Sequence, residues 1–170
     1  MKENCMTNRA KLVDVPVVIM LMTNRFSKSD IKFMMSDNES DFDIMYCYSG
    51  NMRSLKVRRN SAKHYKSSNF SVSINKNNLA EFSNSTFAFI DEVANAIYLV
   101  DGVALLQYMI DHSAKVNMLE TNSSMGWIII PKKDILNMIS DNPNSIIKYN
   151  NAIAKILENG RNELMFKDLL

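Results

Sequence analysis

The sequence predicts an α/β domain in which a central mixed β-sheet is flanked by helices and carries a basic β-hairpin. Short apolar runs typical of buried strands occur at 86–90, 96–100 and 126–130. Segments with apolar residues at helical spacing follow the second and third of these runs. The chain has 170 residues, of which 46% are hydrophobic, and shows neither a repeat nor a Pro/Gly/Ser-rich linker. We therefore expect all 170 residues to form one domain with its own core.

The first forty residues predict one helix and one strand. Residues 1–8 have the character of a loose terminus. A helix is expected from Pro16 to about Asn24, because proline is tolerated in the first helical turn. A strand is expected at 31–36, followed by an acidic loop at 37–41.

A β-hairpin is the clearest predicted element. Residues 42–49 are rich in Tyr, Phe and Ile, and residues 52–59 alternate between apolar and polar types. Gly50-Asn51 between them suits a tight turn. The hairpin is expected to point Ile44 and Tyr46 to one face, and Met45 to the other.

The second half of the chain alternates strands and helices. Asp101 is suited to cap a helix that begins directly after a strand, because its carboxylate can accept a backbone N–H. Asn159-Gly160 is expected to end the last helix. The other expected elements are a strand at 70–74, a short helix or turn at 77–82, strands at 86–90, 96–100 and 126–130, and helices at 132–139 and 144–158.

Positive charge is concentrated on the hairpin and the segment after it. Seven Lys or Arg residues and no acidic residue lie between Asp43 and Glu81, although the whole chain has a net charge of only +2. Such a local positive field favours a polyanion as partner, with nucleic acid the first candidate. The alternative is that these cations protect an exposed strand edge from aggregation.

Several classes of protein are disfavoured by what the sequence holds. The longest apolar stretch, Val15 to Met22, is too short for a bilayer, so no membrane partner is expected. Two cysteines give no disulfide framework, which favours a cytoplasmic, intracellular location. Neither a Gly-x-Ser-x-Gly motif nor a Gly-rich phosphate loop is present. The abundance of Met and Asn is typical of an AT-rich genome, as in many phages and low-GC bacteria, and so suggests a bacterial or phage-infected cell.

The hairpin and the strands after it resemble the restriction-endonuclease-like, or PD-(D/E)XK, nuclease superfamily. In that family a strand beginning with Asp leads through a turn to a strand with an acid and a lysine two residues apart. Here Asp43 begins the first strand and Lys56-Val57-Arg58 lies on the second. The resemblance covers roughly Ile31 to Ile130 and implies a magnesium-dependent DNA endonuclease, a hydrolase.

The motif departs from the family pattern at both later positions. Lys56 stands where the family has an acid or Gln, and Arg58 stands where it has the catalytic lysine. The resemblance thus implies catalytic positions at Asp43, Lys56 and Arg58, with Asp43 as a ligand for Mg²⁺. An ammonium cannot ligate magnesium, and arginine cannot act as a base. A second metal ligand would have to come from another acid, for which the nearest candidates are Asp37, Glu39, Asp41 and Glu81.

The remaining basic residues are candidates for contacts with phosphate. These predicted nucleic-acid-binding residues are Arg53, Arg59, Lys63, His64 and Lys66. Tyr46, Tyr48 and Tyr65 are suited to stacking on bases, although strand spacing favours core packing equally.

The sequence therefore predicts a DNA-binding protein of nuclease-like fold with a degenerate active site. One alternative is an active magnesium-dependent endonuclease. A second is a phage-type protein that binds and modulates a host protein. Strandedness, DNA against RNA, and oligomeric state are left open.

Overall fold

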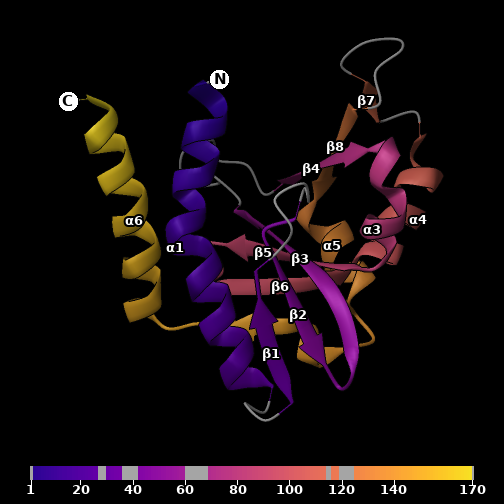
Figure 1. Ribbon diagram of the computed structural model, residues 1–170, viewed down its shortest axis with the longest axis horizontal. Helices are drawn as coiled ribbons and strands as arrows, with labels where there is room; N and C mark the ends of the chain where they lie inside the picture. The colour runs from indigo at the N-terminus through magenta and orange to yellow at the C-terminus, as the bar shows by residue number, and fades with distance from the viewer. Residues whose placement is uncertain are drawn as a thin grey trace.

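A six-stranded mixed β-sheet forms the centre of the computed structural model (Figure 1). Only the β3–β5 pair is parallel; the neighbouring pairs on either side of it are antiparallel. The strands, in spatial order, are β1 (Ile31–Met34), β2 (Ile44–Tyr48), β3 (Asn51–Arg59), β5 (Ser85–Asp91), β6 (Ala96–Asp101) and β9 (Ile146–Lys148). The structure describes residues 2–26, 30–35, 42–59, 69–113, 116–118 and 125–169.

A second, antiparallel sheet packs beside the first. Its strands, in spatial order, are β4 (Asn69–Asn75), β8 (Met125–Pro131) and β7 (Asn117–Met118). The expected strands at 70–74 and 126–130 are therefore confirmed, but they belong to this small sheet and not to the central one.

Helices cover both faces of the central sheet, which confirms the predicted α/β class. On one face α1 (Lys2–Arg25) lies antiparallel to α6 (Asn151–Leu169) (Figure 1). On the other face lie α3 (Leu79–Ser83), α4 (Gly102–Asp111) and α5 (Lys132–Met138), with the short 3-10 helices η1 (Lys76–Asn78) and η3 (Pro143–Ser145) between elements. Within the described ranges, no helix is both long and apolar enough to cross a membrane.

The central sheet separates two apolar clusters. The cluster beneath α1 and α6 contains Val18, Leu55 and Ile97, none of which has measurable exposure. The cluster on the opposite face joins the central sheet to the small sheet through Phe70, Phe89 and other residues. Because successive residues of a strand point to opposite faces, β5, β6 and β9 contribute to both clusters, whereas β1, β2 and β3 contribute only to the one beneath α1 and α6.

The hairpin is confirmed, with its turn one residue earlier than expected. Tyr48 pairs with Asn51, which leaves Ser49 and Gly50 as the two turn residues. Both have positive φ, 50° and 82°, as a two-residue turn matching strand twist requires. Tyr46 packs in the cluster beneath α1, as the predicted alternation requires.

The N-terminal helix is longer than the sequence predicts. The expected start at Pro16 and the expected loose terminus at 1–8 are both wrong, since α1 begins at Lys2 and contains Pro16 in its interior. The Pro16 side chain is exposed, whereas Val17 and Val18 are buried. The carbonyl that proline leaves without a helical donor can therefore be hydrated on the solvent side.

The expected helix at 144–158 is wrong in its first part. Ile146 and Ile147 belong to β9, which pairs with β6 at the edge of the central sheet. The helix begins only at Asn151. Two adjacent isoleucines are compatible with the spacing of a helix and with that of a strand. They form a strand here because the edge of β6 offers backbone groups to pair with.

The expected helix end at Asn159-Gly160 is also wrong, because α6 continues to Leu169. Gly160 is buried, and a Cβ atom built on it would lie 2.6 Å from Cγ2 of Val13 in α1. The glycine therefore permits close contact between α1 and α6 and does not act as a cap.

Gly160→Ala should lower the free energy of unfolding by about 1 kcal/mol, although alanine is the better helix former by a similar amount. The reason is the overlap with Val13. In a Val13→Ala background the same change should cost less, because the two Cγ atoms are absent and only the Cβ of residue 13, at 2.9 Å, still overlaps. Urea unfolding of the four variants of this cycle measures the coupling, with Asn159→Ala as an exposed control. Equal effects in both backgrounds would contradict the proposed contact.

Candidate nucleic-acid interface

A cleft of about 220 Å³ lies between the two sheets, on the face opposite α1. It opens where β3 of the central sheet approaches β4 of the small sheet. Its lining consists of Phe42, Lys56, Arg58, Ser73, Asn75, Asn78, Phe82 and Phe87.

The alternation of β3 brings two of the predicted catalytic positions into this cleft together. Leu55 and Val57 are buried beneath α1, so Lys56 and Arg58 point to the other face. Lys56 lies beside Phe87 and Arg58 beside Phe89 in the parallel pairing with β5. Both side chains are half-buried.

Aromatic rings form the apolar part of the cleft. The ring centroids of Phe42 and Phe87 are 5.8 Å apart, and those of Phe82 and Phe87 are 4.9 Å apart. This packing holds α3 against β5 beside the polar lining, which β3, β4 and η1 carry. Asn75 is fixed as well, because its side chain accepts a hydrogen bond from the backbone N–H of Asn77 at 3.0 Å.

Arg58 is electrostatically the most unusual residue of the cleft. Burial lowers the pKa of its guanidinium, and the nearby Asp43 carboxylate acts in the opposite direction. Among the described residues, the buried Nε–H of Arg58 has no hydrogen-bond acceptor. Arginine does not lose its proton in proteins, so the cleft contains an incompletely hydrogen-bonded positive charge.

Asp43 joins the two strands of the hairpin at its open end. Its backbone N–H donates to the Leu55 carbonyl at 2.9 Å, and its Oδ2 accepts the backbone N–H of Val57 at 2.7 Å. The carboxylate therefore satisfies a β3 donor beyond the end of β2. The same carboxylate supplies negative charge beside Arg58.

The described residues around Asp43 do not by themselves fit a magnesium site. Lys56 lies on β3 between Arg58 and Ser54, and Ser54 Oγ lies 3.4 Å from Oε1 of Glu81. Lys56 and Arg58 thus lie on the strand beside the carboxylates of Asp43 and Glu81. A magnesium ion would need oxygen ligands in place of these two cations. Within the described residues, no group of three His, Cys, Asp or Glu side chains is placed to hold a metal ion.

Arg53 and Arg59 point to the face opposite the cleft and contact carboxylates there. Arg53 forms an ion pair with Asp101 at 3.2 Å. Arg59 forms ion pairs with Asp14 and Glu92, the latter at 3.0 Å. The structure therefore does not bring these two predicted phosphate-binding residues together with Lys56 and Arg58.

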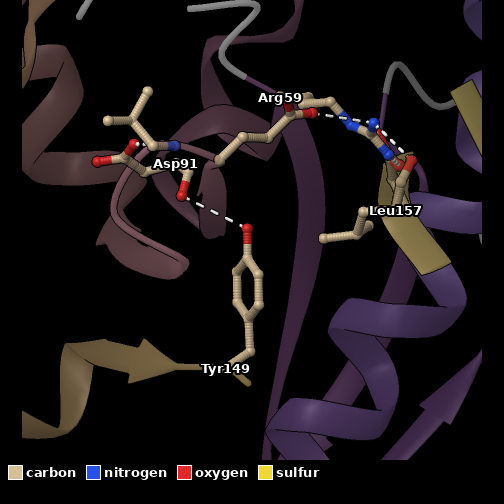
Figure 2. A network of polar contacts seen from close by, with 7 residues as sticks. Arg59, Asp91, Tyr149 and Leu157 are labelled. Atoms are coloured by element: carbon tan, nitrogen blue, oxygen red, sulfur yellow. Dashed lines mark hydrogen bonds and ion pairs between the residues drawn. The ribbon is translucent and has the colours of Figure 1, made fainter. Parts of the chain in front are cut away.

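Arg59 connects four elements in the interior. Its guanidinium contacts Asp14 of α1 and Glu92 after β5. It also donates to the carbonyl of Leu157 in α6 at 2.9 Å (Figure 2). Only 12% of its side chain is exposed, and 7% of each carboxylate partner. The network was not predicted, because a strand pattern does not reveal which acids from distant elements will meet it.

Tyr149 extends this interior polar region. Its hydroxyl points to the backbone carbonyl of Asp91 at 3.4 Å (Figure 2). Burial raises the pKa of Tyr149 to about 12, so the hydroxyl stays protonated. Asp91 itself accepts from Tyr98 and forms an ion pair with Lys132, both at 2.7 Å.

Several predicted site residues lie outside the described part of the chain. These are Lys63, His64 and Lys66, the tyrosine at 65, and the candidate acids Asp37, Glu39 and Asp41. Conversely, the cleft contains Ser73, Asn75 and Asn78, which sequence reasoning did not select. Their one sequence signal is the polar alternation of 71, 73 and 75 along β4.

No protein-family model and no curated protein matches the chain. A solved structure of D212, a nuclease from a fusselovirus, is similar to it with a TM-score of 0.48 and 10% sequence identity. The alignment covers 92% of this chain and 94% of that one. The function proposed below rests on the residues of this chain.

Arg59→Met should lower the free energy of unfolding by about 3–5 kcal/mol, because it leaves two buried carboxylates without their cation. Arg58→Met, one residue earlier and on the other face, should cost far less, because that guanidinium is incompletely hydrogen-bonded. Urea unfolding at neutral pH compares the two. Equal losses would contradict the interior role of Arg59.

Proposed function

We propose that the protein binds DNA through the cleft between β3 and β4, as a nuclease-like protein with a degenerate active site. Lys56 and Arg58 contact backbone phosphates in this proposal. The proposal uses the same strand positions that the restriction-endonuclease resemblance singles out, with a binding role in place of catalysis.

The observation that carries the proposal is the state of Arg58. A half-buried guanidinium with a buried, unsatisfied N–H is costly, by about 1–3 kcal/mol or more for a charged group. A phosphate oxygen in the cleft would offset the buried charge by accepting charge-assisted hydrogen bonds from the other N–H groups of the guanidinium, because Nε itself is enclosed. Lys56, on the same face and two residues away, adds a second positive charge.

The uncharged lining also suits a phosphate backbone. Ser and Asn side chains are common partners of phosphate and sugar oxygens, together with Arg and Lys. Ser73, Asn75 and Asn78 stand across the cleft from the two cations. Such contacts position a duplex without reading its sequence.

The sequence between β3 and β4, which lies outside the described residues, is also basic. The segment that joins the end of β3 to the start of β4 contains Lys63, His64 and Lys66 and no acid.

Cleavage is not part of the proposal, because the residues beside Asp43 do not fit a magnesium ion. Lys56 occupies the position of a second carboxylate, and Arg58 cannot accept a proton. We expect no chelator-sensitive nicking of plasmid DNA by the native chain. Robust nicking that is lost in Asp43→Ala would instead favour the endonuclease alternative.

DNA affinity should fall steeply with salt, and Lys56→Gln or Arg58→Gln should flatten the dependence. Each lost phosphate contact should reduce the slope of log K against log salt by about 0.9 for duplex DNA. Fluorescence anisotropy of a labelled duplex, titrated at several salt concentrations, measures both slopes. A single-stranded DNA and a duplex RNA of the same length distinguish the class of nucleic acid.

The matched control is Lys148→Gln, which should leave the slope unchanged. Lys148 is an exposed cation on β9, the edge strand of the central sheet beyond β5 and β6. Thermal unfolding verifies that each variant is folded. No binding of any of the three nucleic acids at low salt would overturn the proposal and leave a protein partner.

Lys56→Glu should convert the cleft from one that disfavours Mg²⁺ to one that binds it. Glutamate at 56 would stand among Asp43 and Glu81, so the variant should be less stable without divalent cations through like-charge repulsion. Mg²⁺ should then restore stability, by about 1.4 kcal/mol when its free concentration is tenfold above the dissociation constant. The double variant Lys56→Glu/Arg58→Lys should respond at least as strongly.

Thermal unfolding with Mg²⁺ or with chelator measures this response. The native chain and Lys148→Glu, which makes the same charge change far from the cleft, should show no stabilisation by Mg²⁺. A stabilisation of the native chain equal to that of Lys56→Glu would contradict the assignment of Lys56.

A further inference from the structure

A second cavity, of about 340 Å³, lies on the other face of the central sheet. It is floored by β2, β3, β5 and β6 and walled by the end of α1 and by η3. Its volume falls within the range of about 300–1,000 Å³ that is typical of small-molecule sites. Its lining consists of Met22, Phe26, Ile31, Tyr46, Tyr48, Arg53, Thr86, Leu99, Asp101, Asn142, Asn144 and Ser145.

The floor of the cavity is a chain of hydrogen bonds. The hydroxyls of Tyr46 and Thr86 are 2.6 Å apart, and Arg53 Nε donates to Thr86 Oγ1 at 3.1 Å. Arg53 Nη2 also pairs with Asp101 Oδ2 at 3.2 Å. Asp101 is held in turn by the backbone N–H of Val103, which donates to its Oδ1 at 2.8 Å. The polar groups are therefore fixed before any ligand arrives.

The charges of the floor balance. Arg53 and Asp101 form an ion pair, and they are the charged residues that line the cavity in the part of the chain that the structure describes. A phosphate or carboxylate group would meet an arginine that already has a carboxylate partner, unlike in the cleft. The floor suits a neutral molecule that both donates and accepts hydrogen bonds.

The walls differ in character. On one side, Phe26 and Tyr48 lie with ring centroids 5.0 Å apart at 56°, and 37% of Tyr48 is exposed. On the other side are the amides of Asn142 and Asn144. Oδ1 of Asn142 accepts the backbone N–H of Asn144 at 3.1 Å, which orients that side chain.

Arg25 connects the end of α1 to the segment that carries η3 and β9. Nη2 of Arg25, at the end of α1, donates to the carbonyls of Pro143 and Ile146 at 3.4 Å each. The aromatic wall, which α1 carries in part, is thereby connected to the amide wall.

We propose that this cavity binds a nucleobase. A base is planar and neutral, has a face that stacks on aromatic rings, and carries donors and acceptors along its edge. The exposed ring of Tyr48 offers the stacking surface, and the amides and the floor offer partners for the edge. The base site and the phosphate cleft lie on opposite faces of one sheet, so the two proposals stand or fall separately.

The test is calorimetry of the full chain with adenosine, guanosine, cytidine and uridine, and with ribose 5-phosphate as a ligand without a base. At least one nucleoside should bind and ribose 5-phosphate should not. Tyr48→Ala should weaken the binding by about tenfold, the effect of losing one stacking partner. Asn144→Ala, on the opposite exposed wall, should weaken it independently.

The matched control is Met52→Ala. The exposed fraction of Met52, 39%, is similar to that of Tyr48, and Met52 lies on the same hairpin but points to the opposite face of the sheet. It should bind nucleosides as the native chain does. Lys56→Gln should also leave nucleoside binding unchanged, because Lys56 lines the cleft and not the cavity.

The source of the base is resolved by a second titration with a short single-stranded oligonucleotide. Oligonucleotide binding that depends on Tyr48 shows that the cavity takes a base from a nucleic-acid strand. Nucleoside binding without oligonucleotide binding shows that its ligand is a free nucleoside. Either supports the site. Failure of all four nucleosides to bind, or binding that Lys56→Gln abolishes and Tyr48→Ala does not, would overturn it.

Discussion

The ion-pair network of Arg59 is the constraint on which the arrangement of the layers depends. One guanidinium at the end of β3 contacts α1, the turn after β5 and α6. Two buried carboxylates, those of Asp14 and Glu92, are unfavourable without a cation. The helix and the turn that carry them must therefore lie within reach of the Arg59 guanidinium. The same network fixes the face of β3 that is interior, and therefore fixes which cations of the strand remain for other tasks.

The two faces of β3 consequently have different chemistry. Arg53, Leu55, Val57 and Arg59 face the helical layer of α1 and α6, where both arginines have carboxylate partners. Lys56 and Arg58 face the small sheet and its polar side chains. The sheet thus divides a run of cations that is continuous in the sequence into an ion-paired set on the face of α1 and a set that lines the cleft.

The sequence predicts well what depends on local geometry. The hairpin alternation and the Asp101 cap of α4 follow from spacing and from a side chain acting on its own neighbours. It fails where distant elements decide. Gly160 has the sequence character of a helix end, yet contact with Val13 explains it. Ile146-Ile147 became a strand because β6 has an edge to pair with. The roles of Arg58 and Arg59 could not be separated either, since nothing in the chain's order reveals that Asp14 lies beside Arg59.

The Asp101 side chain connects α4 on one face of the central sheet to Arg53 on the other face. One carboxylate oxygen holds the first turn of α4, and the other holds Arg53 at the floor of the cavity on the far side of the sheet. When that side chain leaves its rotamer, the helix end loses its acceptor at the same moment as the arginine loses its counter-charge. Fraying of α4 and loosening of the cavity floor are therefore one local opening event, and amide hydrogen exchange at Val103 would report on a space that lies across the sheet from it.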